Sequence, residues 1–120
     1  MDTYNLGTKG EEIARDYLVS QGYQILEEQW RYNKAEIDLI CRHEDILVFV
    51  EVKARASKYY GLPEEFVTQK KQRLITAAAS AYMQKVNHDW AIRFDIVGVV
   101  VPPVGNHKVH HFKDAFFLGL

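Results

Sequence analysis

Two apolar runs joined by a short polar turn constrain the fold of this chain most strongly. Residues 36–41 form the first run, residues 46–53 form the second, and the polar residues 43–45 lie between them. Runs of this length at this spacing are typical of a β-hairpin, whose strands are antiparallel neighbours. The second run is apolar on both faces, and strands of that kind are usually covered on both sides.

Charged side chains interrupt both runs. Because side chains alternate across a strand, Glu36 and Asp38 share one face of the first strand, and Glu51 and Lys53 share one face of the second. Burying an unpaired charge costs several kcal/mol, so such charges must be paired, hydrogen-bonded or bound to a metal. We therefore expect Glu51 and Lys53 at the rim of the covered region, with Asp38 on the neighbouring strand.

An amphipathic helix is predicted over residues 6–21, followed by Gly22 as a left-handed cap. Its buried stripe consists of Ile13, Ala14, Tyr17 and Leu18. Glu11 falls beside this stripe, which makes it the acid of this helix best placed to face inward. Alternatively, Glu11 is a helix N-terminal carboxylate that complements the helix dipole.

The rest of the chain reads as further strands and one more helix. Strands are predicted at residues 23–31, from near Ala35, and at residues 90–101 and 109–112. A helix capped by Thr68 is predicted to run to about Lys85. This order predicts a single domain over residues 1–120, an α/β or α+β sandwich with a central mixed sheet flanked by helices.

Polar residues outside the hairpin are expected mainly in structural roles. Arg93 and Asp95 share a face of their predicted strand and are expected to pair. The loop of residues 56–63 is either a plain connection or a ligand contact beside the charged strand end. Three histidines fit no strong metal-ligand spacing and are expected at the surface: His107, His110 and His111.

Charge, cysteine content and hydropathy indicate which partners and which cellular compartment to expect. The net charge of -1 gives no hint of nucleic acid, but residues 31–73 carry nine basic and seven acidic residues. The balance there becomes nine against four if Glu36, Asp38 and Glu51 hold a cation. The single Cys41 lies in an apolar run and is interpreted as a core residue in a reducing compartment. With no signal-peptide pattern and no run of membrane-spanning length, we expect a cytoplasmic protein without membrane association.

The acids of the hairpin suit metal-assisted hydrolysis of a phosphodiester. Mg²⁺ prefers oxygen ligands, which Asp38, Glu51 and the carbonyl of Val52 could supply, with Glu11 as a further ligand. A metal-bound water becomes a better nucleophile as its pKa falls. Lys53 could orient that water or neutralise charge that develops on the phosphate.

Several segments together resemble a known family. Residues 10–14, 36–40 and 49–55, with Lys70 and residues 93–95, are similar to the bacterial YraN-like proteins. These proteins are similar to the PD-(D/E)XK nuclease superfamily, and especially to archaeal-type Holliday junction resolvases. The resemblance runs from about residue 6 to residue 96.

The resemblance implies a restriction-endonuclease-like αβββαβ core. It places Asp38, Glu51 and Lys53 at the catalytic positions of the superfamily and Glu11 at the helical acid of the resolvases, and Glu36 lies in the same motif as Asp38. Ala35 stands where the family usually has glycine.

The first hypothesis is a Mg²⁺- or Mn²⁺-dependent endonuclease that hydrolyses DNA, with branched or junction DNA among the candidate substrates. Four basic residues are expected on the phosphate backbone: Arg55, Lys70, Lys71 and Arg73. A homodimer that engages two strands is a further expectation. The alternative is a non-catalytic nucleic-acid-binding or protein-interaction module that retains the nuclease fold. A third interpretation is a structural network in which the acids only pair with Lys53 and nearby arginines.

Overall fold

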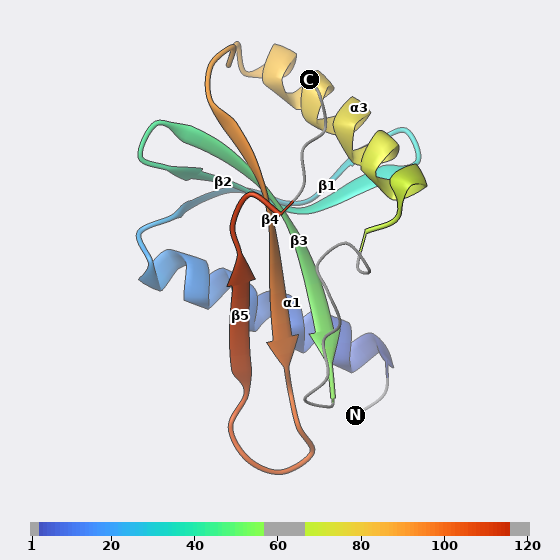
Figure 1. Ribbon diagram of the computed structural model, residues 1–120, viewed down its shortest axis with the longest axis vertical. Coiled ribbons are helices and arrows are strands. Elements are labelled where there is room, and N and C mark those ends of the chain that lie inside the picture. Colours follow the sequence, from blue (N-terminus) through green and yellow to red (C-terminus); the bar gives the residue numbers. More distant parts are fainter. Residues whose placement is uncertain (1–2, 57–66, 116–120) are drawn as a thin grey trace.

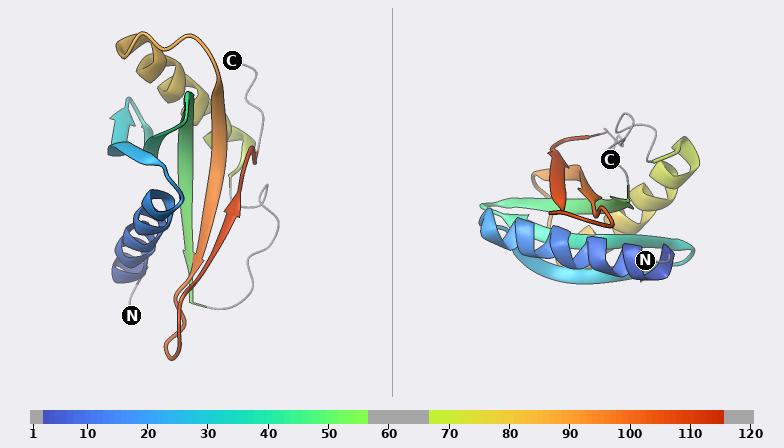
Figure 2. Two further views of the ribbon diagram at one scale, coloured as in Figure 1. Left: turned by 90° about the vertical axis from the view of Figure 1, so that its left-hand side faces the viewer. Right: turned by 90° about the horizontal axis from the view of Figure 1, so that it is seen from below.

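Two helices cover opposite faces of a five-stranded sheet in the computed structural model, which describes residues 3–56 and 67–115 (Figure 1; Figure 2). The elements, in chain order, are α1 (Thr3–Ser20), β1 (Gln24–Tyr32), β2 (Ala35–His43), β3 (Ile46–Arg55), α3 (Gln69–Lys85), β4 (Ile92–Val100) and β5 (Lys108–Phe112). The αβββαβ order implied by the resemblance is confirmed, with β5 added at its end. The expected loop of residues 56–63 lies outside the described residues, apart from Ala56.

The sheet is mixed, as predicted. Its strand order is β1-β2-β3-β4-β5, and only the β3–β4 pair is parallel. A parallel pair needs a crossover connection, which here contains α3. The predicted hairpin of β2 and β3 is confirmed and forms the middle of the sheet (Figure 1).

Local signals account for where the helices begin and end. Gly22 has a φ of +90°, a left-handed conformation that suits glycine, and it lies two residues after the end of α1. The side chain of Thr68 accepts a hydrogen bond from the backbone N–H of Lys71 at 3.2 Å, which caps the first turn of α3. Both predicted caps are confirmed.

The core consists of two apolar clusters, one on each face of the sheet. The cluster under α1 contains Ile13, Ala14 and Leu18 of the predicted helix stripe, and Tyr17 packs against it while half-buried. The cluster under α3 contains Phe49, Ile75, Ala78 and Phe94. The alternation predicted for β3 is confirmed, because Leu47 and Phe49 face α3 while Val48 and Val50 face α1. Cys41 is buried under α1, as expected.

The regular alternation of β2 changes at Asp38. Ile37 belongs to the cluster under α3, whereas Leu39 belongs to the cluster under α1 and Ile40 again to the one under α3. The paired residues of β2 and β3 run from Leu39 and Val50 to the turn, so Asp38 lies where the two strands stop pairing. The sheet therefore opens at the acidic end of the hairpin.

A buried polar network anchors β5 to the sheet. Arg93 pairs with Asp95 as predicted, with Nε donating to Oδ1 at 2.8 Å and Nη2 to Oδ2 at 2.9 Å. His107 and His110 are exposed, but the surface position expected for His111 is wrong. β5 pairs with β4, and this brings His111 Nε2 within 2.6 Å of the fully buried Asp95 and its Nδ1 within 3.0 Å of the Tyr17 hydroxyl.

No helix in the part of the chain that the structure describes is long and apolar enough to cross a membrane.

Candidate active site

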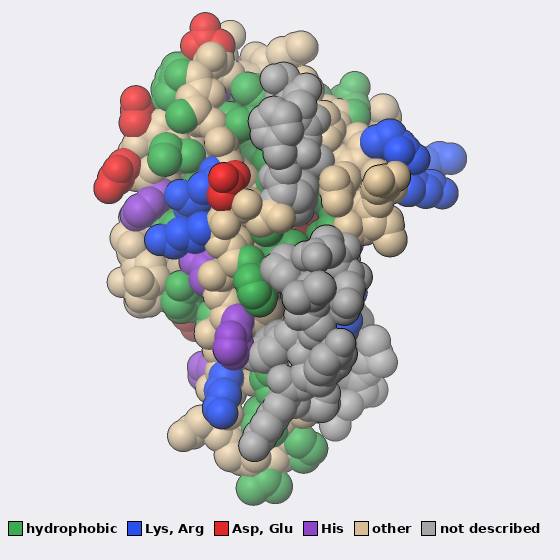
Figure 3. All heavy atoms as spheres, viewed as in Figure 1, with side chains coloured by type: hydrophobic (Ala, Val, Ile, Leu, Met, Phe, Trp, Pro, Cys, Tyr) green, Lys and Arg blue, Asp and Glu red, His purple; other side chains and the backbone are tan. Residues whose placement is uncertain are grey.

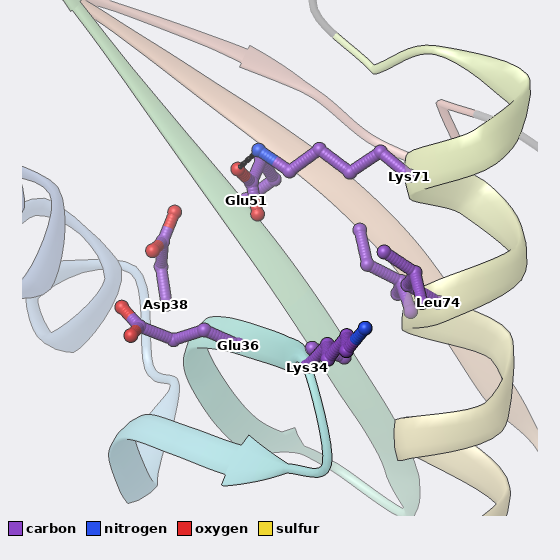
Figure 4. A pocket seen from close by; sticks show the side chains of 8 residues that line it. Lys34, Glu36, Asp38, Glu51, Lys71 and Leu74 are labelled. Atoms are coloured by element: carbon purple, nitrogen blue, oxygen red, sulfur yellow. Dashed lines mark hydrogen bonds and ion pairs between the residues drawn. The ribbon is translucent and has the colours of Figure 1, made fainter.

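A cavity of about 330 Å³ opens where β2 and β3 stop pairing (Figure 4). Asp38 and Glu51 come from the two strands, and Lys71 and Leu74 come from α3 on the other side. The complete lining consists of Lys34, Ala35, Glu36, Asp38, Glu51, Lys71, Leu74 and Ile75. The hairpin thus brings three of the predicted catalytic acids to one hollow: Glu36, Asp38 and Glu51.

Asp38 is held by the backbone of the neighbouring strand. The N–H of Val52 donates to Asp38 Oδ2 at 2.8 Å, which satisfies a backbone donor that the open sheet leaves free. Burial first, and then the negative charge of Glu51, raise the pKa of Asp38 to about 7. The hydrogen bond from Val52 and the charge of Lys71 act in the opposite direction without offsetting these effects. The two carboxylates of Asp38 and Glu51 therefore lie close enough to repel each other when both are ionised.

Glu51 is buried and forms an ion pair with Lys71 of α3 (Figure 4). The sequence predicts Lys71 on the phosphate backbone and Lys53 beside the acids. A signal for Lys71 was present in the helix spacing. Lys71 lies four residues before the buried Ile75 and seven before the buried Ala78, and such residues share one face of a helix. The face of α3 that covers the sheet therefore also carries Lys71 to Glu51.

Lys53 lies partly buried in β3, two residues beyond Glu51. Burial first, and then the positive charges of Arg55 and Lys71, lower its pKa, while the charges of Glu51 and Asp38 raise it. The net direction is downward. Lys53 thus lies within electrostatic reach of both acids, although it does not line the cavity.

Glu11 faces the site from α1, as the first interpretation predicted. Burial, followed by the charge of Asp38, raises the pKa of Glu11, and Gln29 Nε2 donates to Glu11 Oε2 at 2.8 Å. The alternative of an N-terminal carboxylate is wrong, because α1 begins at Thr3 and its first turn contains no acid. Glu36 lines the cavity and pairs with Arg31 at 2.9 Å.

The four acids each have their own protein partner: Val52 for Asp38, Lys71 for Glu51, Gln29 for Glu11 and Arg31 for Glu36. Among residues 3–56 and 67–115, no three histidine, cysteine or acidic side chains form a group that could hold a metal ion. The chemistry of the donors nevertheless suits a hard divalent cation, since two crowded carboxylates from adjacent strands supply its preferred oxygens. The contact between Val52 and Asp38 uses the N–H of Val52. A role for the Val52 carbonyl stays a prediction.

Positive charge gathers at the start of α3, where Figure 3 shows a group of Lys and Arg side chains. Lys70 and Arg73 are exposed there, and Arg55 is partly buried at the end of β3. Lys71 alone of the four expected phosphate contacts lines the cavity. Its neighbours on α3 extend the positive surface away from the acids.

Comparisons with known proteins identify the family. The model of "Uncharacterised protein family UPF0102" matches residues 10–99. The UPF0102 protein of Flavobacterium psychrophilum is 42% identical over 113 residues, covering 94% of each chain. The UPF0102 protein of Rhodococcus opacus is 39% identical over 112 residues, covering 92% of this chain and 95% of its own.

One solved structure, "The structure of Pyrococcus Furiosus SfsA in complex with Ca2+", aligns with 93% of this chain at 15% identity and a TM-score of 0.41. This chain spans 64% of that protein. The family match confirms the resemblance to the YraN-like proteins, and this chain belongs to the uncharacterised protein family UPF0102.

Proposed function

We propose that this protein is a metal-dependent endonuclease that hydrolyses phosphodiester bonds of DNA. The observation that carries the proposal is the pair of acids at the open end of the β2–β3 hairpin. Asp38 and Glu51 lie close enough for the charge of Glu51 to help raise the pKa of Asp38 to about 7. A fold gains nothing in stability by crowding like charges, whereas a divalent cation would relieve the repulsion.

In this proposal Asp38 and Glu51 hold Mg²⁺ or Mn²⁺, and Glu11 contributes from α1. The bound metal would supply a water of lowered pKa and would polarise the phosphate. Lys53 and Lys71 carry positive charge beside the acids, where they can neutralise the charge that grows on a phosphate during its hydrolysis. Lys70, Arg73 and Arg55 extend this charge toward the rest of the DNA backbone. Junction DNA as substrate and a dimer as active form belong to the same proposal.

The competing function is a nucleic-acid-binding module without catalysis, and one contact favours it. The ammonium group of Lys71 already compensates the charge of Glu51. If this pair is permanent, no metal enters and the acids serve only the structure. If a divalent cation can displace Lys71, the lysine becomes free to contact a phosphate. The two functions therefore differ in whether the site binds a metal.

Calorimetric titration of Mn²⁺ separates these functions without a choice of substrate. Wild type should bind Mn²⁺, and Asp38→Ala and Glu51→Ala should each abolish binding while circular dichroism shows an intact fold. Glu12→Ala is the matched control, because Glu12 neighbours Glu11 but is exposed. It should bind Mn²⁺ like the wild type.

Cleavage is then tested on linear and branched DNA with Mg²⁺ or Mn²⁺. Cleavage by wild type, and its loss in Asp38→Ala, would support the proposal. Absence of Mn²⁺ binding with and without DNA would contradict the proposal. Cleavage that persists in both Asp38→Ala and Glu51→Ala would also contradict it.

A further inference from the structure

A second hollow of about 540 Å³ adjoins the cavity lined by Asp38 and Glu51, which we call the carboxylate cavity. Its lining is Tyr32, Asn33, Lys34, Ala35, Leu74 and Ala77, and we refer to it as the Tyr32 groove. Lys34, Ala35 and Leu74 also line the cavity that contains Asp38 and Glu51, so the two hollows share a wall. Figure 4 shows the side chain of Lys34 next to Leu74 of α3. A ligand that enters one hollow can therefore extend directly into the other.

The ring of Tyr32 is both accessible and held in place. Tyr32 is 39% exposed at the end of β1. It stacks with Trp30 at a centroid distance of 6.3 Å and an interplanar angle of 5°. Trp30 in turn packs edge-on against Tyr82 of α3 at 5.2 Å. The Tyr32 ring is thus the outermost member of an aromatic row that begins in the core, and it needs little ordering before a ligand stacks on it.

The remaining walls of the Tyr32 groove are chemically divided. Ala35, Leu74 and Ala77 present apolar surface, while Lys34 contributes a cation at the boundary with the carboxylate cavity. A nucleotide is divided in a similar way, because the flat faces of its base are apolar and the phosphate, joined to the base through a sugar, is charged. An aromatic platform beside a positive charge is how proteins bind single-stranded nucleic acid without reading its sequence. The volume also falls within the range of roughly 300–1,000 Å³ that is typical of ligand pockets.

We propose that the Tyr32 groove binds an unpaired nucleobase of the strand whose phosphate lies at Asp38 and Glu51. This inference rests on the proposed nuclease function for the position of the phosphate. A base within a continuous duplex is stacked on both faces and cannot lie against a protein ring unless it leaves the stack. The substrate class is therefore DNA with an unpaired base next to the scissile bond, as at a single-stranded end or a branch. Fully paired duplex DNA cannot use the groove.

The test is a binding measurement in EDTA, so that it does not depend on metal or cleavage. Fluorescence anisotropy would compare oligothymidine, an abasic oligonucleotide of the same length, and blunt duplex DNA. Wild type should bind oligothymidine more tightly than the abasic strand. Tyr32→Leu should weaken binding of oligothymidine by roughly 5- to 150-fold, which is the range found when a stacking ring is removed. It should leave binding of the abasic strand and the duplex unchanged.

Two variants control for folding and for the loss of any aromatic ring. Tyr32→Phe keeps the stacking ring and should restore tight binding of oligothymidine. Trp90→Leu removes another exposed ring, 46% accessible and outside the groove, and should have no effect on any of the three ligands.

The inference is overturned if wild type binds oligothymidine and the abasic strand equally, a comparison that needs no variant. It is also overturned if Tyr32→Leu weakens binding of all three ligands alike. In either case Mn²⁺ binding and cleavage would still judge the nuclease proposal separately. A base preference in a protein that binds no Mn²⁺ would instead retain the groove and reject the nuclease.

Discussion

Replacing Asp38 with asparagine should stabilise the protein at neutral and alkaline pH. An aspartate in the unfolded chain has a pKa near 3.8, whereas burial and then the charge of Glu51 raise the pKa of the folded Asp38 to about 7. As the pH rises above 3.8, the unfolded state releases its proton first, so folding becomes less favourable until the folded carboxyl also ionises near pH 7. The wild type therefore loses stability between these two pH values, and asparagine, which does not titrate, escapes this loss.

The size of the effect follows from the shift in pKa. A difference of about three units corresponds to roughly 4 kcal/mol at about 1.4 kcal/mol per unit. This is an upper limit, because the site can relax around the charge. The stability advantage of Asp38→Asn should thus grow from close to zero near pH 4 to at most about 4 kcal/mol near pH 8. The amide oxygen can still accept the hydrogen bond from Val52, so the backbone contact need not be lost.

Urea unfolding followed by circular dichroism at several pH values would measure this advantage. Glu12→Gln, at an exposed acid of α1, controls for the loss of one negative charge. Saturating Mn²⁺ should reverse the order of stability, because a ligand stabilises only the folded state that binds it. If Asp38→Asn is less stable than wild type near pH 8, or if the difference does not change with pH, the carboxylate stabilises the fold as part of a structural network and our reasoning is wrong.

Two further predictions concern the scaffold. A Cβ on Gly10 would lie 2.6 Å from the Cβ of Ala54, so Gly10→Ala should destabilise the fold by about 1–3 kcal/mol in urea titrations. Gly7→Ala, in the same helix with no described atom within 4 Å, should instead stabilise it by about 0.5–1 kcal/mol, and equal effects at both sites would contradict this packing of α1 on β3. Asp95→Ala should cost about 3–5 kcal/mol, because it leaves Arg93 without its buried partner. Burial would raise the pKa of Asp95, but hydrogen bonds from His111 and Arg93 lower it below 3.8. The contribution of Asp95 to stability should therefore be present above that pH and disappear in stronger acid. A melting temperature of Asp95→Ala equal to that of wild type near pH 7 would refute this role.

Much of the fold was predictable because its signals are local. Gly22 marks the end of α1, and Thr68 marks the start of α3. Both caps are found in the structure. The hairpin was predictable from two apolar runs and the turn between them. The acids were predictable as candidate site residues because a carboxylate at the end of an apolar strand must be paired, hydrogen-bonded or bound to a metal.

Part of the candidate site could not be predicted, because it depends on how α3 lies across the sheet. The spacing of Lys71 and Ile75 shows that they share a helix face, but only the docking of that face brings Lys71 to Glu51. The pKa of Asp38 likewise depends on burial and on a charge thirteen residues away, both of which arise only on folding. His111 was misplaced for the same reason. Its burial follows from the pairing of β5 with β4, and polar residues on an edge strand give no local sign of a buried partner.

The helices, the hairpin and the position of Asp38 and Glu51 at one end of it thus follow from local signals in the chain, because periodicity, capping and turns act over a few residues. The packing of the folded chain was needed to show which lysine pairs with Glu51 and that Tyr32 borders a groove next to the acids. Those relations join β1, β2, β3 and α3, and the contacts between them depend on packing across the sheet.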